Sequence, residues 1–309
     1  MMITEWKKRS IRAKEVERII RISGNKRKFK EMSEEEFQKQ MEEAEKNYEK
    51  PFPNPEKIIR RNVEEFYIND KMQTFVWGNE DSNHIILYFH GGAYVYPPML
   101  LHFKAVDNIA KKTGARVYFP IYPRIPAYHF KDVYPLVDKL YSDILKTAPP
   151  ESVTLMGDSA GGGIALGFAL WLKDFDLPQP KNIILISPWL DVTMSNKSME
   201  KYEKKDPLLA VWGLRKMGQI WAGGKDDRIM PYVSPIYGDH EGLGKITMLV
   251  GTRELFYPEV MRFSKLLHQQ KIDYNLLIAH KMNHAFPVMP IPEGRRSQNF
   301  IADIINEKI

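Results

Sequence analysis

The chain has 309 residues, of which 43% are hydrophobic and 27% are charged, and it contains no cysteine. These proportions are typical of a globular protein and exclude a disordered, collagen-like or disulfide-stabilised chain. The length suits one large α/β domain with a small covering domain. Because cysteine is absent, the sequence excludes disulfides, thiolate metal ligands and cysteine nucleophiles, and it indicates a reducing compartment.

Lysine and arginine outnumber aspartate and glutamate by 45 to 39, which gives a net charge of +6. Much of this excess lies within residues 1–30, but no nucleic-acid-binding motif accompanies it. A solvated basic surface is therefore favoured over a nucleic-acid partner. The longest apolar stretch, 161–172, is too short to cross a bilayer, and the N-terminus has no apolar run of signal-peptide length. We expect a cytoplasmic protein without stable membrane insertion.

Residues 1–55 are expected to form N-terminal helices. Ser33 and Glu36 fit a capping box, in which each residue's side chain bonds the other's backbone amide. Four apolar residues then fall on one helical face, namely Phe37, Met41, Ala44 and Tyr48. A proline-rich segment at 51–55 ends the helix, because proline has no amide hydrogen to donate. The apolar face must pack on another part of the chain, so we expect these helices to form part of a cap.

The rest of the chain, 56–309, reads as the main domain. Residues 58–77 favour two antiparallel edge strands with a turn at Asn69-Asp70. Buried strands then alternate with amphipathic helices, which is typical of a mostly parallel sheet covered on both faces. Six core strands are expected, at 84–89, 116–121, 153–156, 182–186, 246–250 and 274–279.

An insertion at about 191–245 is longer than a simple strand-to-helix connection. It contains Trp212 and Trp221 and is interrupted by glycine and proline. Together with the N-terminal helices, it is expected to form a small helical cap.

A serine motif lies between a predicted strand and a predicted helix. Strand 153–156 runs into Gly-Asp-Ser-Ala-Gly, and a glycine-rich apolar helix follows, which gives the order strand, G-x-S-x-G, helix. Gly157 and Gly161 permit a tight turn, so the hydroxyl of Ser159 is expected to stand above the sheet as a nucleophile. Taken alone, the five-residue pattern also fits an ordinary glycine-rich turn or a dinucleotide-binding loop.

A second motif provides what a serine nucleophile needs. Strand 84–89 ends in the sequence HGGAY at 90–94. Glycine amides directly after a strand can face a developing oxyanion without obstruction by side chains. We therefore expect the oxyanion hole to consist of the amides of Gly91, Gly92 and Ala160.

The HGGAY motif followed by GDSAGGG resembles the hormone-sensitive-lipase-type family of α/β-hydrolases, in its bacterial carboxylesterase branch. Further segments agree with the resemblance, at 122–126, 187–191 and 206–208. It extends from about residue 85 to the C-terminus. It implies an α/β-hydrolase fold, with a mostly parallel central sheet, helices on both faces and a small helical cap, and it implies hydrolysis of short-chain acyl esters.

The resemblance also implies a triad in the order serine, acid, histidine. His284 begins the sequence HAFP after strand 274–279 and is expected to be the general base, while His280 stands at the edge of that strand. Glu254 takes the place of the family's usual aspartate after strand 246–250, and Glu259 is the alternative acid. Arg253 is expected to pair with a carboxylate.

Four other histidines and one aspartate receive supporting or incidental roles. His90 resembles a family position that supports the oxyanion loop. Asp158, next to the nucleophile, is expected to accept hydrogen bonds from nearby groups. The remaining three are expected to be surface or loop residues, namely His102, His129 and His240.

The sequence thus predicts a serine carboxylesterase that needs no metal ion or organic cofactor and acts on a small-molecule ester. A peptidase or amidase of the same fold, and a ligand-binding protein without catalysis, are the alternatives. Family members pair through the last strand and neighbouring helices, which implies a homodimer, although no unusually apolar edge is visible in this sequence.

Overall fold

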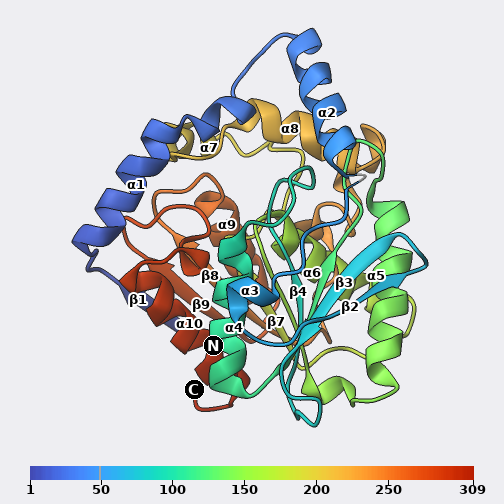
Figure 1. Cartoon of the computed structure of the whole chain (residues 1–309). Helices are drawn as coiled ribbons and strands as arrows, with labels where there is room; N and C mark the ends of the chain where they lie inside the picture. The colour runs from blue at the N-terminus through green and yellow to red at the C-terminus, as the bar shows by residue number, and fades with distance from the viewer. Residues whose placement is uncertain (49) are drawn as a thin grey trace.

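A nine-stranded sheet organises the computed structural model, which describes residues 1–48 and 50–309 (Figure 1). The strand order across the sheet is β1-β9-β8-β7-β6-β4-β5-β3-β2. The strands are β1 Met2–Trp6, β2 Glu64–Ile68, β3 Met72–Trp77, β4 Ile85–Phe89, β5 Arg116–Ile121, β6 Val153–Asp158, β7 Asn182–Ile186, β8 Lys245–Gly251 and β9 Tyr274–Ala279. All six predicted core strands are present and run parallel to one another. The predicted fold class is confirmed.

Helices cover both faces of this sheet (Figure 1). The longer ones are α1 Ile11–Ser23, α2 Glu34–Tyr48, α4 Leu100–Thr113, α5 Phe130–Leu145, α6 Ala160–Asp174, α8 Val211–Trp221, α9 Tyr257–Gln269 and α10 Pro292–Ile305. The shorter ones are α3 Glu56–Ile59, α7 Met199–Glu203 and the 3-10 turns η1 Asn25–Phe29, η2 Pro150–Ser152, η3 Asp226–Ile229, η4 Pro235–Tyr237 and η5 Phe286–Val288.

The two faces of the sheet form two hydrophobic clusters, and β4 contributes to both. Successive side chains of a strand point to opposite faces. Leu87 and Phe89 pack in the cluster that contains α5, α6 and α9, whereas Ile86 and Tyr88 pack in the cluster that contains α4 and α10. Because β4 is buried on both sides, it reads as a continuous apolar run, as the sequence predicted for a central parallel strand.

The predicted hairpin is confirmed at one edge of the sheet. β2 and β3 pair antiparallel, and Asn69 and Asp70 both have positive φ in the turn between them, at 49° and 56°. β3 also pairs antiparallel with β5. The structure corrects the start of this region, because residues Glu56–Ile59 form the short helix α3 instead of a strand.

At the other edge, the N-terminus corrects the prediction that residues 1–55 are helical throughout. Residues Met2–Trp6 form β1, which pairs in parallel with β9. The pairing is long-range, and Trp6 is buried against α10, where its ring contacts Phe300. β1 therefore occupies the outer side of β9, the last strand, through which the expected homodimer would have paired.

Segments far apart in the sequence lie together beyond the carboxyl ends of the parallel strands. Figure 1 shows α1, η1 and α2 (blue) beside α7 and α8 (yellow). The rings of Phe37 in α2 and Trp212 in α8 meet edge to face at 5.6 Å, and η1 packs on α8 at Gly213. The predicted capping box is also formed, since Ser33 N donates to Glu36 Oε2 at 2.9 Å.

None of the helices in the described residues is both long enough and apolar enough to span a membrane.

Candidate active site

Ser159 occupies the sharp turn between β6 and α6. Its backbone has φ 55° and ψ −121°, a combination that is rare for a residue with a side chain and typical of strained functional turns. The Ser159 amide donates to the Ile186 carbonyl at 2.9 Å, and its carbonyl accepts from the Trp189 amide at 2.9 Å. These contacts with β7 and the segment after it hold the turn in place.

Two glycines make this turn possible. A Cβ atom on Gly157 would collide with the carbonyl oxygen of Gly161, and a Cβ on Gly161 would collide with the carbonyl oxygen of Phe89. The start of α6 therefore approaches the end of β4, where the HGGAY loop begins. The Ser159 side chain is 7% exposed. Within the described residues, Ser159 forms its hydrogen bonds through the backbone alone.

Asp158 is the structural acceptor that the sequence predicted, and it engages Gly91. Oδ1 of Asp158 accepts from the Gly91 amide at 2.8 Å and from the Tyr88 hydroxyl at 2.7 Å. Oδ2 lies 3.3 Å from Nε2 of His102. Burial alone would raise the pKa of Asp158, but His102, Tyr88 and Gly91 lower it to about 2. The amide of Gly91 therefore has an acceptor already, contrary to the expectation that it faces an oxyanion.

The next residues of the loop have unusual backbone conformations. Gly92 and Ala93 have φ values of 134° and 53°. Neither amide donates a hydrogen bond within residues 1–48 and 50–309, although the Gly92 carbonyl accepts from Val95 and Tyr96. The Ala160 amide lies in the first turn of α6, whose amides have no acceptor within the helix. Three unengaged amides thus follow the carboxyl ends of β4 and β6, which are neighbours in the sheet.

His90 braces this loop. Its Nδ1 lies 2.7 Å from the Gly91 carbonyl, and its ring stacks on Tyr122 with 4.4 Å between centroids. The Tyr122 hydroxyl donates to the His90 carbonyl at 2.8 Å. Burial lowers the pKa of His90 to about 3, so this imidazole has too little affinity for a proton to serve as the general base.

The structure brings His284 and Glu254 together. Nδ1 of His284 lies 3.3 Å from Oε2 of Glu254, and both side chains are buried. Glu254 follows β8 and His284 follows β9, so the two loops meet beyond the ends of adjacent parallel strands. The Ala285 amide donates to the Ser187 hydroxyl at 3.1 Å, which fixes the histidine loop against the end of β7.

Asp206 is a second buried carboxylate near this pair, and sequence reasoning did not assign it a role. Its Oδ1 accepts from the amides of Leu208 and Leu209 at 2.7 and 2.9 Å. Its Oδ2 accepts from the amide of Leu255 at 2.7 Å. The one signal in the sequence was the segment Asp-Pro-Leu at 206–208, which was used for the family resemblance alone.

The pKa values of His284, Glu254 and Asp206 are all raised above their ordinary values. Burial alone would lower the pKa of His284, but Glu254, Asp206 and Asp158 raise it, and the net direction is upward. Burial raises the pKa of Glu254, against the lowering effect of His284. Burial raises the pKa of Asp206 in the same way. Three buried acids near one imidazole stabilise its protonated form.

The other candidate residues lie elsewhere. His280 is partly exposed and its Nε2 lies 3.1 Å from Glu5 on β1. Glu259 contacts Asn196 and Arg262 in place of His284. Among the presumed surface histidines, His129 is partly exposed as expected. The expectation of a surface or loop residue is wrong for His102, which is buried in α4 beside Asp158. His240 lies in the loop between η4 and β8, as expected, but it is buried there, with Nε2 2.7 Å from the Pro235 carbonyl.

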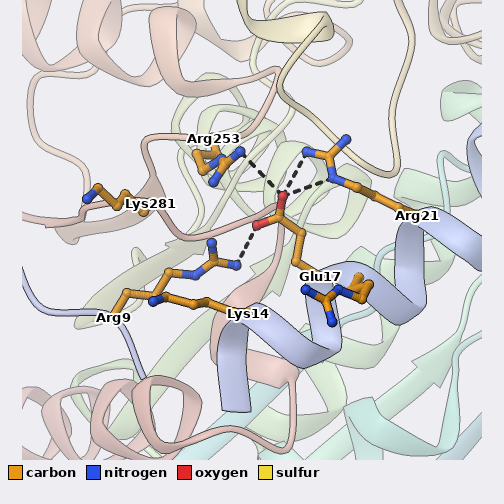
Figure 2. A pocket seen from close by; sticks show the side chains of 7 residues that line it. Arg9, Lys14, Glu17, Arg21, Arg253 and Lys281 are labelled. Carbon is orange, nitrogen blue, oxygen red and sulfur yellow. Dashed lines mark hydrogen bonds and ion pairs between the residues drawn. The ribbon is translucent and has the colours of Figure 1, made fainter. Parts of the chain in front are cut away.

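Arg253, the residue before Glu254, lines a basic cavity together with residues of α1. Figure 2 shows the buried Glu17 of α1 between three arginines. Glu17 contacts Arg9 at 2.5 Å, Arg21 at 2.7 Å and Arg253 at 3.5 Å. The expectation that Arg253 pairs with a carboxylate is confirmed. This network fastens α1 to the loop that carries Glu254.

The family of this chain is established by sequence. Residues 86–288 match the family described as the alpha/beta hydrolase fold, which is more than half of the chain. The chain therefore belongs to the α/β-hydrolases. An acetyl-hydrolase of Streptomyces hygroscopicus is 30% identical over 217 residues, which is 69% of this chain and 72% of that protein. An esterase of Acinetobacter venetianus is 26% identical over 222 residues, 71% and 73% of the two chains.

Solved structures of other proteins have the same fold as this chain. A Staphylococcus aureus protein assigned as an esterase superposes with a TM-score of 0.84 at 29% identity, covering 89% of this chain and 94% of its own. An esterase from the bacterial hormone-sensitive lipase family has the same fold, with a TM-score of 0.80 at 21% identity over 97% and 99% of the two chains. The predicted resemblance to the bacterial hormone-sensitive-lipase-type branch is confirmed.

Proposed function

We propose that the protein is a serine carboxylesterase that hydrolyses short-chain acyl esters, with Ser159 as nucleophile, His284 as general base and Glu254 as the triad acid. The observation that carries this proposal is the strained turn at Ser159. Its amide donates to Ile186 at the end of β7, and the next residue, Ser187, accepts from the Ala285 amide in the loop of His284. The names of the acetyl-hydrolase and esterase relatives support ester substrates.

In the first half of the reaction, His284 removes the hydroxyl proton of Ser159 as Oγ attacks the ester carbonyl. The imidazolium that forms is stabilised by Glu254 on its other nitrogen. His284 then donates its proton to the departing alcohol, which leaves Ser159 acylated. In the second half, water loses a proton to His284 and attacks the acyl group, and Ser159 leaves with that proton. The reaction needs no metal ion or organic cofactor.

The oxyanion donors are proposed to be the amides of Gly92, Ala93 and Ala160. Gly92 and Ala160 belong to the set expected from the sequence. Ala93 replaces Gly91, because the Gly91 amide is bonded to Asp158 while the Ala93 amide has no acceptor within the described residues. The partial positive charge at the start of α6 adds to the stabilisation of a negative oxygen near Ala160.

The helices of 1–55, without β1, and the insertion at 191–245 are proposed to form a cap over the catalytic domain. Supporting this division, α2 packs on α8 through Phe37 and Trp212, and Ser159 and His284 are both buried. A cap that excludes water strengthens the electrostatic interactions of the site.

A series of p-nitrophenyl esters from acetyl to palmitoyl tests the proposal. Release of p-nitrophenol is expected to be greatest with short chains and to fall by at least about 10⁴-fold in Ser159→Ala, because the nucleophile is lost. Ser142→Ala, which removes an exposed hydroxyl on α5, is the matched control and keeps full activity. Undiminished turnover by Ser159→Ala contradicts the proposal. Release from an aminoacyl anilide but from none of the esters would favour the peptidase alternative.

A further inference from the structure

A cavity of about 580 Å³ lies apart from the proposed catalytic residues, between the end of α2, the β2–β3 hairpin and the loop after β5. Its described lining includes three cations, Lys50, Lys71 and Arg124, and one carboxylate, Asp70. Pro97, which closely follows the HGGAY loop, also lines it. The volume is in the range of small-molecule sites.

Arg124 is the unusual member of this lining, because it is buried and has no carboxylate partner among residues 1–48 and 50–309. The residue is 4% exposed, and its Nε and Nη1 are enclosed without hydrogen-bond partners in residues 1–48 and 50–309. The Tyr48 ring lies 4.9 Å from its guanidinium carbon. Nη2 is not among these enclosed unpaired atoms and forms no hydrogen bond within the same residues, and Arg124 is one of the residues that line the cavity.

Other well-covered arginines of this protein have acidic partners. Arg9 contacts Glu17, and Arg116 donates to both carboxylate oxygens of Glu64. An arginine keeps its charge in proteins, and a buried charge without a partner destabilises the fold. Burial lowers the pKa of Arg124, which reflects this unfavourable desolvation. A ligand that supplies the missing negative charge would explain why an arginine is kept here.

The backbone around Arg124 is already ordered for such a ligand. The Arg124 carbonyl accepts from the Tyr128 amide at 3.1 Å, and the Ile125 amide donates to the Tyr94 carbonyl at 3.0 Å. The second bond ties this segment to the HGGAY loop. Across the cavity, the Tyr48 hydroxyl donates to the Lys71 carbonyl at 3.3 Å. A preorganised site loses little conformational entropy when it binds.

We propose that this cavity binds the carboxylate or phosphate group of a small molecule, with Arg124 as the buried donor and Lys50 and Lys71 at the rim. The planar guanidinium can donate two parallel hydrogen bonds to such a group. The ligand is either the acidic part of an ester substrate or a separate anion, and the two sources share this chemistry.

Thermal unfolding of the full chain tests binding without relying on catalysis. Succinate or inorganic phosphate, compared with chloride at equal ionic strength, is expected to raise the Tm of the wild-type protein. Arg124→Met, which has a similar length but no charge, loses this shift, and Arg124→Lys retains part of it. Arg12→Met removes an exposed arginine of α1 and keeps the full shift. Without added anion, Arg124→Met is expected to unfold at or above the wild-type Tm, because it removes an unpaired buried charge.

Kinetics distinguish the two sources of the anion. Mono-p-nitrophenyl succinate and p-nitrophenyl butyrate have the same acyl length, but only the first carries a carboxylate. If the anion is part of the ester substrate, kcat/KM for mono-p-nitrophenyl succinate, divided by kcat/KM for p-nitrophenyl butyrate, falls roughly tenfold or more in Arg124→Met. The same ratio is unchanged in Arg12→Met. If the anion is a separate ligand, phosphate changes the rate of p-nitrophenyl butyrate hydrolysis in the wild type but not in Arg124→Met. Phosphate that raises the Tm without changing this rate also indicates a separate ligand, one that does not affect catalysis.

Two results would overturn the proposal. One is the absence of any anion-dependent Tm shift in the wild type, or an equal shift in Arg124→Met. The other is a large loss of stability in Arg124→Met without anion, since this would make Arg124 a structural residue. If the protein binds succinate but hydrolyses no ester, the anion site is supported and the proposed esterase function fails, so the two failures are distinguishable.

Discussion

Oδ2 of Asp206 accepts a 2.7 Å hydrogen bond from the amide of Leu255, the residue that follows Glu254. This bond joins the segment between β7 and α8 directly to the loop that carries the proposed triad acid. The Gly251 amide, 3.3 Å from Glu254 Oε1, holds the acid from the other side of the same loop. Glu254 is therefore positioned by contacts with its own loop and with the insertion.

Replacement of Asp206 tests this relationship. Asp206→Asn places an amide group where the carboxylate accepts three backbone amides, so at least one of these donors loses its acceptor, at about 1–3 kcal/mol. We expect kcat to fall by roughly 10- to 100-fold with a smaller change in KM, because Glu254 and His284 lose their alignment. Measured kcat and KM for a short ester check this.

The control is Asp226→Asn, an exposed acid of η3, which is expected to leave both constants unchanged. An Asp206→Asn enzyme with wild-type kcat and an unaltered pH profile would show that Asp206 does not position the triad.

The pH profile of kcat/KM should reflect the raised pKa of His284. The base must be neutral to accept the proton of Ser159, so activity falls as the pH drops through the pKa of this histidine in the free enzyme. Glu254 and Asp206 raise that pKa, so the acidic midpoint lies above the ordinary value of 6.5. In Glu254→Gln the midpoint moves to lower pH, because a neutral amide stabilises the imidazolium less. A wild-type midpoint below 6.5 would contradict this assignment.

Asp158 should stabilise the fold at neutral pH, and this contribution should be lost in acid. Its pKa is lowered from 3.8 to about 2 by His102, Tyr88 and Gly91. A carboxylate with a depressed pKa stabilises the fold above its unfolded value, and this stability is lost as the pH falls through the folded value. The shift corresponds to about 2 kcal/mol, which should disappear between roughly pH 4 and pH 2.

Urea unfolding over this pH range measures the contribution. Asp158→Asn is expected to be less stable than the wild type at neutral pH and to lose less stability on acidification, whereas Asp226→Asn follows the wild type. Parallel curves for the wild type and Asp158→Asn would rule out the proposed contribution.

The N-terminal strand should keep β9 from pairing with other molecules. A chain that begins at residue 8 lacks β1, so the backbone of β9 is left with an unpaired edge. It also loses the buried Trp6, and removal of a buried tryptophan costs about 3–5 kcal/mol. We expect a lower Tm and self-association, measured by size-exclusion chromatography with light scattering.

Ile3→Lys is the matched control, because Ile3 is exposed on β1 and its replacement leaves the strand backbone intact. A truncated chain with the wild-type Tm and the wild-type oligomeric state would contradict the prediction.

The sequence by itself determined the features that follow from local pattern. Continuous apolar runs such as β4 identified the central parallel strands, because residues buried on both faces of a sheet are apolar at every position. Glycines around Ser159 identified the tight turn, since only small residues allow the backbone segments to approach there. Asn69 and Asp70 identified the hairpin because these residue types tolerate positive φ.

Only the tertiary structure decided which distant groups meet. β1 has no strong local signal of its own and forms by pairing with a strand at the other end of the chain. Gly91 and Gly92 are indistinguishable in the motif, and the carboxylate of Asp158 selects Gly91 as its partner. Asp206 approaches the loop of the proposed triad acid, and Arg124 is enclosed without an acidic partner in the part of the chain that the structure describes. Both arrangements depend on contacts between segments that are distant in the sequence. Local pattern specifies burial and backbone conformation, whereas the partner of a buried polar group is set by three-dimensional packing.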